Sequence, residues 1–158
     1  MKKFAVIGAT GLVGGAVVKE LAERGHNITA FARNIDKVYQ ADNVQAVAVD
    51  VNNPDFSDKL IGFDAVVNAF NAGWQNPNIV NDLQTGHANI LSAVKRADVP
   101  YVLVVGGAGS LNVAPNLQLV DTPDFPADVY PAANVVRELL GELRTRTDIN
   151  WAFLSPAV

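Results

Sequence analysis

The stretch VIGATGLVGGAVV, residues 6–18, decides the fold that this sequence predicts. An apolar run precedes Gly8, a second apolar run follows Gly14, and Gly11 lies midway between the two glycines. A glycine has no Cβ, and three tasks in such a stretch require this. One glycine allows a tight turn after the strand, a second lets a ligand touch the backbone, and a third lets the helix pack closely. We assign these three tasks to Gly8, Gly11 and Gly14, in that order. The stretch therefore predicts a strand, a phosphate-binding turn and a helix.

The rest of the chain alternates between short apolar runs and amphipathic helical patterns. The apolar runs predict strands over residues 3–7, 27–32, 44–49, 64–70, 101–105 and 151–154. Helical spacing of apolar residues predicts helices after the glycines, over 79–97 and over 132–145. Strands that are apolar throughout are typical of a parallel sheet covered on both faces. We therefore predict an α/β fold over residues 1–158, a single domain whose doubly wound, Rossmann-like parallel sheet has the strand order 3-2-1-4-5-6.

Composition excludes several classes of protein. Apolar residues make up 49% of the 158 residues, which is typical of a globular domain. The net charge is −4 and no cysteine is present, so we expect neither a nucleic-acid partner nor thiolate chemistry. No apolar run reaches the ~20 residues of a membrane helix, and the first run stops at Gly8, too early for a signal peptide. We expect a cytoplasmic monomer or homodimer without a membrane partner.

The sequence also predicts the absence of a metal site. The two histidines, His26 and His87, have no second ligand at a metal-binding spacing. We expect His26 to be exposed in a turn. We expect His87, within the helix predicted over 79–97, to be satisfied by a neighbouring group.

The residues around the glycines form the predicted cofactor loop. A helix N-terminus offers free N–H groups and the positive end of the helix dipole to a pyrophosphate. Thr10 adds a hydroxyl beside this loop. The candidate cofactor-binding residues of the loop are Gly8, Thr10, Gly11, Leu12 and Val13.

The end of the second strand bears on the choice of cofactor. A site specific for NAD usually places an acid there, on the ribose hydroxyls. This strand is followed by Arg33 and Asn34, and the first acid is Asp36. Arg33 can pair with a 2′-phosphate and Asn34 can add a hydrogen bond, whereas the alternative is a solvated arginine. The pattern favours NADP(H) over NAD(H).

Two further strand ends supply candidate cofactor-binding residues. Asp50 and Val51 follow the third strand, where Asp50 either accepts from the adenine amino group or caps the turn. Ala69, Phe70 and Asn71 follow the fourth strand, where small residues let the cofactor ribose lie against the backbone. The alternative for the residues that follow the fourth strand is an ordinary loop without a ligand.

Six features together resemble the atypical short-chain dehydrogenase/reductases. The resemblance covers essentially the whole chain. Within this superfamily, the features resemble most specifically the NmrA-like branch, which includes NAD(P)H-flavin reductases. The resemblance implies a nicotinamide dinucleotide in the crevice of the sheet and a small-molecule acceptor beside it. The matching features are GATGLVG, Arg33 after the second strand, VVNAF, VLVVGGAGSL, DTPDFP and WAFLSPA.

The sequence departs from this family in two ways. Many members use a Tyr-x-x-x-Lys pair, but Asn134 stands four residues after Tyr130 and carries no charge. Tyr130 and Ser110 remain candidate catalytic residues: Tyr130 either touches the substrate or only packs, and Ser110 either bonds to a substrate carbonyl or only shapes its loop. Members of the branch also continue past LSPA into a small lobe, so we expect this chain to lack a substrate-covering segment at its C-terminus.

The leading hypothesis is an NAD(P)H-dependent reductase that passes hydride to a flat acceptor such as a flavin or quinone. Such a transfer needs orientation and proximity more than an acid–base pair. The second hypothesis is a redox sensor of the NmrA type, which binds NAD(P) without turnover. A nucleotide-sugar epimerase is disfavoured by the missing Tyr–Lys pair and the short chain.

Overall fold

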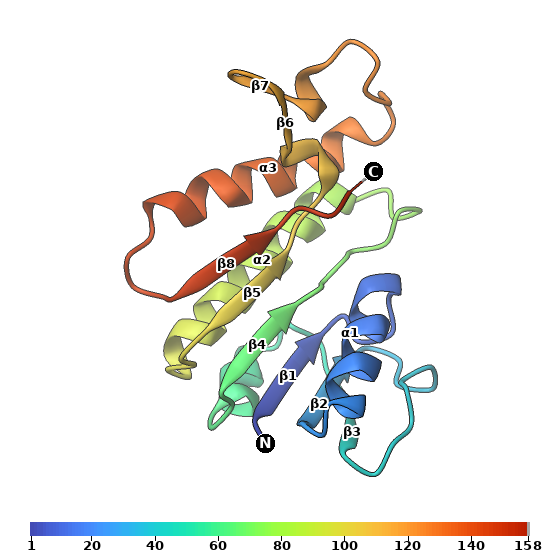
Figure 1. The fold of residues 1–158 in the computed structure, drawn as a ribbon, viewed down its shortest axis with the longest axis vertical. Helices are drawn as coiled ribbons and strands as arrows, with labels where there is room; N and C mark the ends of the chain where they lie inside the picture. Colours follow the sequence, from blue (N-terminus) through green and yellow to red (C-terminus); the bar gives the residue numbers. More distant parts are fainter. Residues whose placement is uncertain (158) are drawn as a thin grey trace.

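A six-stranded parallel sheet organises the computed structural model, which describes residues 1–157 (Figure 1). The strand order is β3-β2-β1-β4-β5-β8, and all five pairings are parallel. Since β8 is the sixth strand of this sheet along the chain, the predicted order 3-2-1-4-5-6 is confirmed. The strands are β1 (Lys3–Ile7), β2 (Asn27–Ala32), β3 (Val44–Ala48), β4 (Ala65–Asn68), β5 (Val102–Val105) and β8 (Trp151–Leu154).

Three α-helices cover the sheet, and they do so unevenly. α1 (Leu12–Glu23) lies on one face, whereas α2 (Ile79–Arg96) and α3 (Tyr130–Thr145) lie on the other (Figure 1). The larger core, on the side of α2 and α3, includes Phe31, Ile90 and Leu143. A smaller core, on the side of α1, is built around Val6 and Val18.

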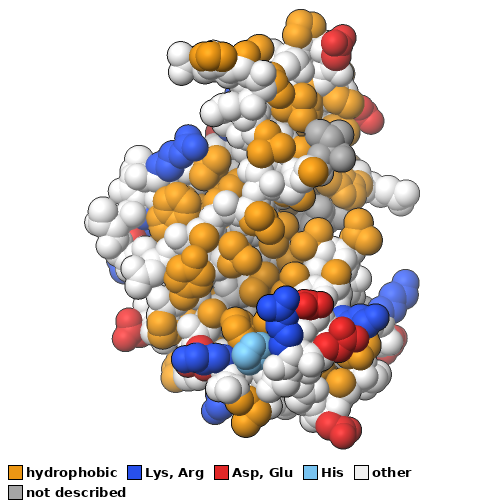
Figure 2. All heavy atoms as spheres, in the orientation of Figure 1, with side chains coloured by type: hydrophobic (Ala, Val, Ile, Leu, Met, Phe, Trp, Pro, Cys, Tyr) orange, Lys and Arg blue, Asp and Glu red, His pale blue; other side chains and the backbone are white. Residues whose placement is uncertain are grey.

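The apolar strands led us to expect that helices cover both faces of the sheet. This expectation is wrong for one part of the sheet. Val102 and Val104 of β5 are fully buried toward α2 and α3, but Leu103 and Val105 are only half-buried. α1 packs on β1 and β2 and therefore does not extend over β5 and β8. Hydrophobic side chains gather on this face (Figure 2), and Leu154 of β8 is 52% exposed.

The segment between β5 and α3 forms structure that the sequence did not predict. A short antiparallel hairpin joins β6 (Asn112–Ala114) to β7 (Leu117–Gln118), with Asn116 in the left-handed region at φ 58°. The hairpin lies beyond the end to which the strands of the large sheet point (Figure 1). Among the described residues, three 3₁₀ helices complete the fold: η1 (Pro54–Leu60), η2 (Ala108–Ser110) and η3 (Leu119–Asp121). Within residues 1–157, no helix combines the length and apolar character needed to span a bilayer.

Candidate functional site

The glycine loop joins β1 to α1 under tight steric constraint. Gly8 has φ +75°, which glycine adopts without strain, and a Cβ on it would lie 2.3 Å from the carbonyl oxygen of Ala69. A Cβ on Gly14 would lie 2.1 Å from the carbonyl oxygen of Gly8. Because both contacts are with backbone atoms, neither position has room for a side chain. Gly8 therefore makes the turn and Gly14 lets α1 approach it closely.

The first turn of α1 carries no capping group of its own. Gly11 is the N-cap residue, no side chain caps the helix, and no acidic residue lies in the first turn. Leu12 is 95% exposed and Val13 is also exposed, so this end of the helix lies at the surface. Uncapped N–H groups at the positive end of a helix dipole suit a phosphate group.

The residues that follow β2 lie on the surface. Arg33 and Asn34 are both exposed. The side-chain oxygen of Asn34 accepts a hydrogen bond of 2.9 Å from the backbone N–H of Asp36, which closes a turn. The amide nitrogen of Asn34 is not part of that bond, so it can still donate to a ligand beside Arg33.

The residues that follow β3 are engaged within the protein. Asp50 accepts a hydrogen bond of 2.9 Å from the backbone N–H of Asn52, so its carboxylate caps the turn. Val51 is buried in the larger core. A ligand at this end of the sheet can reach Asp50 through its second oxygen, but it can reach Val51 only through the backbone.

The residues that follow β4 point in different directions. The backbone N–H of Ala69 donates to the carbonyl of Ile7 at 3.0 Å, which holds Ala69 beside the glycine loop. The ring of Phe70 packs on α2, where a Cβ on Gly86 would lie 2.3 Å from it. Asn71 is exposed and accepts a 2.7 Å hydrogen bond from the N–H of Gly73. Of the three candidates, Ala69 lies directly against the loop.

A buried polar pair fixes this segment to α2. Asn68 is fully buried, and its side-chain oxygen accepts from the N–H of Phe70 at 3.1 Å. Its amide nitrogen therefore donates to Nδ1 of His87, 3.1 Å away, which requires a neutral imidazole with its proton on Nε2. Burial lowers the pKa of His87 to about 4. The prediction that a neighbour satisfies His87 is confirmed, but the sequence analysis missed Asn68, whose place in an apolar strand was the available signal.

This pair makes the stability of the protein dependent on pH. Unfolded, His87 takes up a proton near its ordinary pKa of 6.5, whereas the folded protein resists protonation down to about pH 4. The unfolded state thus binds more protons between these values, and stability falls as the pH decreases from 6.5 to 4, by about 3 kcal/mol in all. Urea unfolding at pH 7, 5.5 and 4 measures the fall. We expect His87→Gln, which cannot titrate, to lose less stability over the same range, and equal losses would contradict the assignment.

The two candidate catalytic residues differ in exposure. Ser110 ends η2, is 8% exposed, and its hydroxyl has no hydrogen-bond partner among the described residues. Its backbone carbonyl accepts from the side chain of Gln118 at 3.1 Å. Tyr130 begins α3 and is 41% exposed. Tyr130 lines a cavity of about 420 Å³, and Ser110 is not among the residues that line it.

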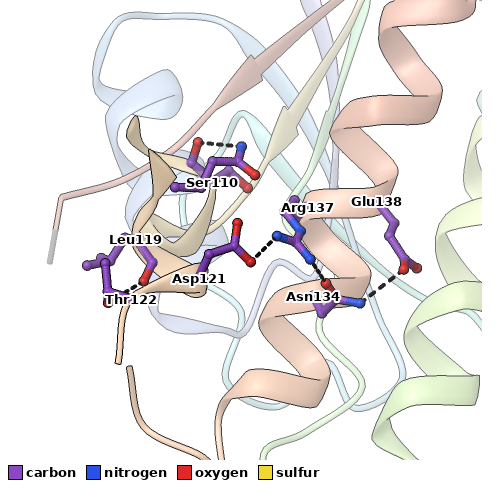
Figure 3. Close-up of polar contacts among 8 residues, drawn as sticks. Ser110, Leu119, Asp121, Thr122, Asn134, Arg137 and Glu138 are labelled. Atoms are coloured by element: carbon purple, nitrogen blue, oxygen red, sulfur yellow. Dashed lines mark hydrogen bonds and ion pairs between the residues drawn. The ribbon is translucent and has the colours of Figure 1, made fainter. Parts of the chain in front are cut away.

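An ion pair that sequence analysis missed lies next to Tyr130. Arg137 pairs with Asp121 of η3 at 2.5 Å and donates a second hydrogen bond to the side-chain oxygen of Asn134 (Figure 3). Asn134 in turn donates to Glu138 at 3.0 Å. The hydrogen bond to Asp121 is the main cause that raises the pKa of Arg137, and Tyr130 adds to it.

The structure therefore places a cation near Tyr130 although Asn134 occupies the lysine position. Tyr130 and Arg137 are seven residues apart on one helix, a spacing that puts them on one face. That spacing was the signal in the sequence. The described residues contain no group of three or more His, Cys, Asp or Glu side chains placed to hold a metal ion.

Comparisons with known sequences match almost the whole chain. The model of the NAD(P)H-binding family matches residues 8–158. The uncharacterized protein YwnB of Bacillus subtilis (strain 168) is 41% identical over 157 residues, which are 98% of this chain and 71% of YwnB.

Two solved structures are similar over the whole chain. A "putative NADH-flavin reductase" from Streptococcus pneumoniae TIGR4 has a TM-score of 0.86 at 36% identity, covering 100% of this chain and 73% of that one. A "putative epimerase" from Bacteroides thetaiotaomicron has a TM-score of 0.89 at 36% identity, covering 99% of this chain and 71% of that one. The chain therefore belongs to the NAD(P)H-binding family, within the atypical short-chain dehydrogenase/reductase-like superfamily.

Proposed function

We propose that the protein is an NAD(P)H-dependent reductase of the NmrA-like branch, with a flat acceptor such as a flavin or quinone. The observation that carries the proposal is the glycine loop, where an uncapped helix N-terminus meets backbone with no room for side chains at Gly8 and Gly14. These residues fit the pyrophosphate of a dinucleotide, which needs N–H donors and close approach to the backbone. The similar structure from Streptococcus pneumoniae supports a flavin as acceptor.

The chain offers residues for three parts of such a cofactor: the pyrophosphate, the 2′-phosphate and the ribose of the nicotinamide half. Leu12 and Val13 would bind the pyrophosphate through their backbone N–H groups, with the Thr10 hydroxyl beside them. Gly11, whose own N–H donates to the carbonyl oxygen of Gly8 at 3.0 Å, would let the pyrophosphate approach the backbone. The Arg33 guanidinium would pair with a 2′-phosphate, which favours NADP(H). Ala69 would hold the ribose of the nicotinamide half against the backbone. When bound, a reduced nicotinamide supplies the hydride.

The residues beside the acceptor would orient it rather than exchange protons with it. Asn134 leaves Tyr130 without the lysine of the Tyr-x-x-x-Lys pair, and the nearby Arg137 is engaged by Asp121. A reduced flavin or quinone can take its proton from water, so proximity and orientation carry the reaction. The same missing lysine argues against epimerase chemistry. The single domain over 1–158, the cytoplasmic location and the monomeric or dimeric state stay predictions.

Steady-state oxidation of NADPH with a panel of flavins and quinones tests this function. We expect turnover with at least one flat acceptor, and faster turnover with NADPH than with NADH. Tight binding of NADPH without turnover of any acceptor would contradict a reductase and favour the sensor of the NmrA type.

Tyr130→Phe tests the orienting role. Because no proton from Tyr130 is required, we expect kcat to stay within about threefold of the parent, with a rise in KM from one lost hydrogen bond of about 0.5–1.5 kcal/mol. A general acid at this position would instead cost about 10²–10⁴ in kcat. A loss of a hundredfold or more at saturating acceptor, with an unchanged melting temperature, would show that Tyr130 is a catalytic acid.

A further inference from the structure

The cavity beside Tyr130 has the size of a small-molecule site. Its volume is about 420 Å³, within the range of ligand pockets. η3, the loop that follows it and the first residue of α3 form its walls. Three lining side chains are apolar and three are polar: Val120, Phe125 and Ala127, and Asp121, Thr122 and Tyr130.

The polar groups of this cavity mostly accept hydrogen bonds. Asp121 is a carboxylate that engages Arg137 through Oδ1, which leaves Oδ2 free of that pair (Figure 3). The hydroxyl of Thr122 donates its proton to the carbonyl of Leu119 at 2.7 Å, so it can offer a ligand only its lone pairs. Tyr130 alone can both donate and accept. A ligand that satisfies this cavity must therefore bring an N–H or O–H donor of its own.

The charge of the cavity disfavours an anion. Asp121 is paired with Arg137, so the two charges largely offset one another. No lysine or arginine is among the residues that line the cavity. The loop between η3 and α3 adds two exposed acids, Asp124 and Asp128. A phosphate or carboxylate would thus be repelled by these acceptors and negative charges, whereas an uncharged ring would not be repelled.

We propose that this cavity binds the imide edge of a flavin ring, with Asp121 accepting from the imide N–H and Tyr130 donating to an adjacent ring carbonyl. The apolar side chains of Val120 and Phe125 would contact the ring. This inference rests on the proposed reductase function and narrows its acceptor. A quinone carries only carbonyl acceptors and would find a single donor, Tyr130. A flavin phosphate group would find no cation among the lining residues, and the neighbouring Arg137 is already paired with Asp121.

Binding to the full-length protein tests the proposal without turnover. Quenching of flavin fluorescence gives dissociation constants for riboflavin, for FMN and for 3-methylriboflavin, in which a methyl group replaces the imide proton. We expect 3-methylriboflavin to bind at least about tenfold more weakly than riboflavin, as the loss of a hydrogen bond to a charged group implies. We expect FMN and riboflavin to bind with similar affinity.

Two variants separate the acceptor group from the ion pair. Asp121→Leu keeps a similar shape, removes the ion pair and accepts no hydrogen bond, so it should bind riboflavin and 3-methylriboflavin equally. Arg137→Met removes the same ion pair but keeps the carboxylate, so it should still prefer riboflavin. If breaking the ion pair were the cause of a lost preference, both variants would show it.

The results distinguish this inference from the function on which it rests. Equal affinity of the parent protein for riboflavin and 3-methylriboflavin would overturn the inference, as would a preference that survives in Asp121→Leu. FMN binding at least about tenfold more tightly than riboflavin would overturn the charge argument. If flavin binding shows the predicted preference but NADPH is not oxidised, the site stands and the reductase function fails. If NADPH is oxidised and both flavins serve equally, the function stands and the site is wrong.

Discussion

Gly11→Val should abolish dinucleotide binding while the protein stays folded. Gly11 is exposed at the N-cap of α1, and a Cβ there would lie 3.3 Å from the carbonyl oxygen of Gly8, a distance that a small shift relieves. The valine methyl groups would occupy the space that a pyrophosphate needs. Loss of several charge-assisted hydrogen bonds implies at least about a hundredfold weaker binding. Isothermal titration with NADPH measures the affinity.

Gly141→Val is the matched control for this variant. Gly141 lies in α3, remote from the loop, and a Cβ there would meet no atom within 4 Å. It carries the same substitution into a helix and should leave NADPH affinity unchanged. A Gly11→Val protein that melts like the parent and binds NADPH with the parent's affinity would show that the cofactor does not lie on this loop.

Arg33→Asp should change the choice of cofactor. The variant removes a charge-assisted contact to the 2′-phosphate and puts a like charge beside it. A contact of this kind is worth about 1.5–3 kcal/mol, so we expect a ten- to hundredfold loss of NADPH affinity. NADH has no 2′-phosphate, and its affinity should change much less. Titration of both cofactors against both proteins gives the four dissociation constants.

Lys37→Asp makes the same change of charge four residues further along the exposed segment. It should lower NADPH affinity only slightly, because a distant surface charge is screened by salt. Equal losses for NADPH and NADH in Arg33→Asp would show that Arg33 does not read the 2′-phosphate. Equal effects of Arg33→Asp and Lys37→Asp would reduce the role of Arg33 to general electrostatic attraction.

The sheet could be predicted because its signals are local. Each strand is a contiguous apolar run, and the glycines that join β1 to α1 lie within seven residues of each other. The phosphate-binding half of the candidate site is readable for the same reason. The sequence led us to expect that helices cover Leu103 and Leu154, which remain partly exposed. An apolar side chain shows that a position is suited to burial, but it does not show which element buries it.

Two polar contacts of the candidate site join residues whose pairing no local pattern reveals. Arg137 and Asp121 are 16 residues apart, and His87 and Asn68 are 19 apart. Both pairs join elements whose relative positions follow only from the complete fold. The walls of the cavity include η3, which is three residues long, and such short irregular segments lack the periodicity from which elements are predicted.

The contact between Gly8 and Ala69 has a thermodynamic consequence for any ligand of the loop. The backbone of Ala69, the residue directly after β4, fills the space that a side chain on Gly8 would need, and the hydrogen bond from Ala69 to Ile7 holds it there. The conformational entropy of this cradle is thus lost when the chain folds and not when a ligand arrives. Binding to a preorganised surface retains free energy that a mobile loop would spend on ordering. The chain loses this conformational entropy once, when the residue after one strand packs against the neighbouring loop.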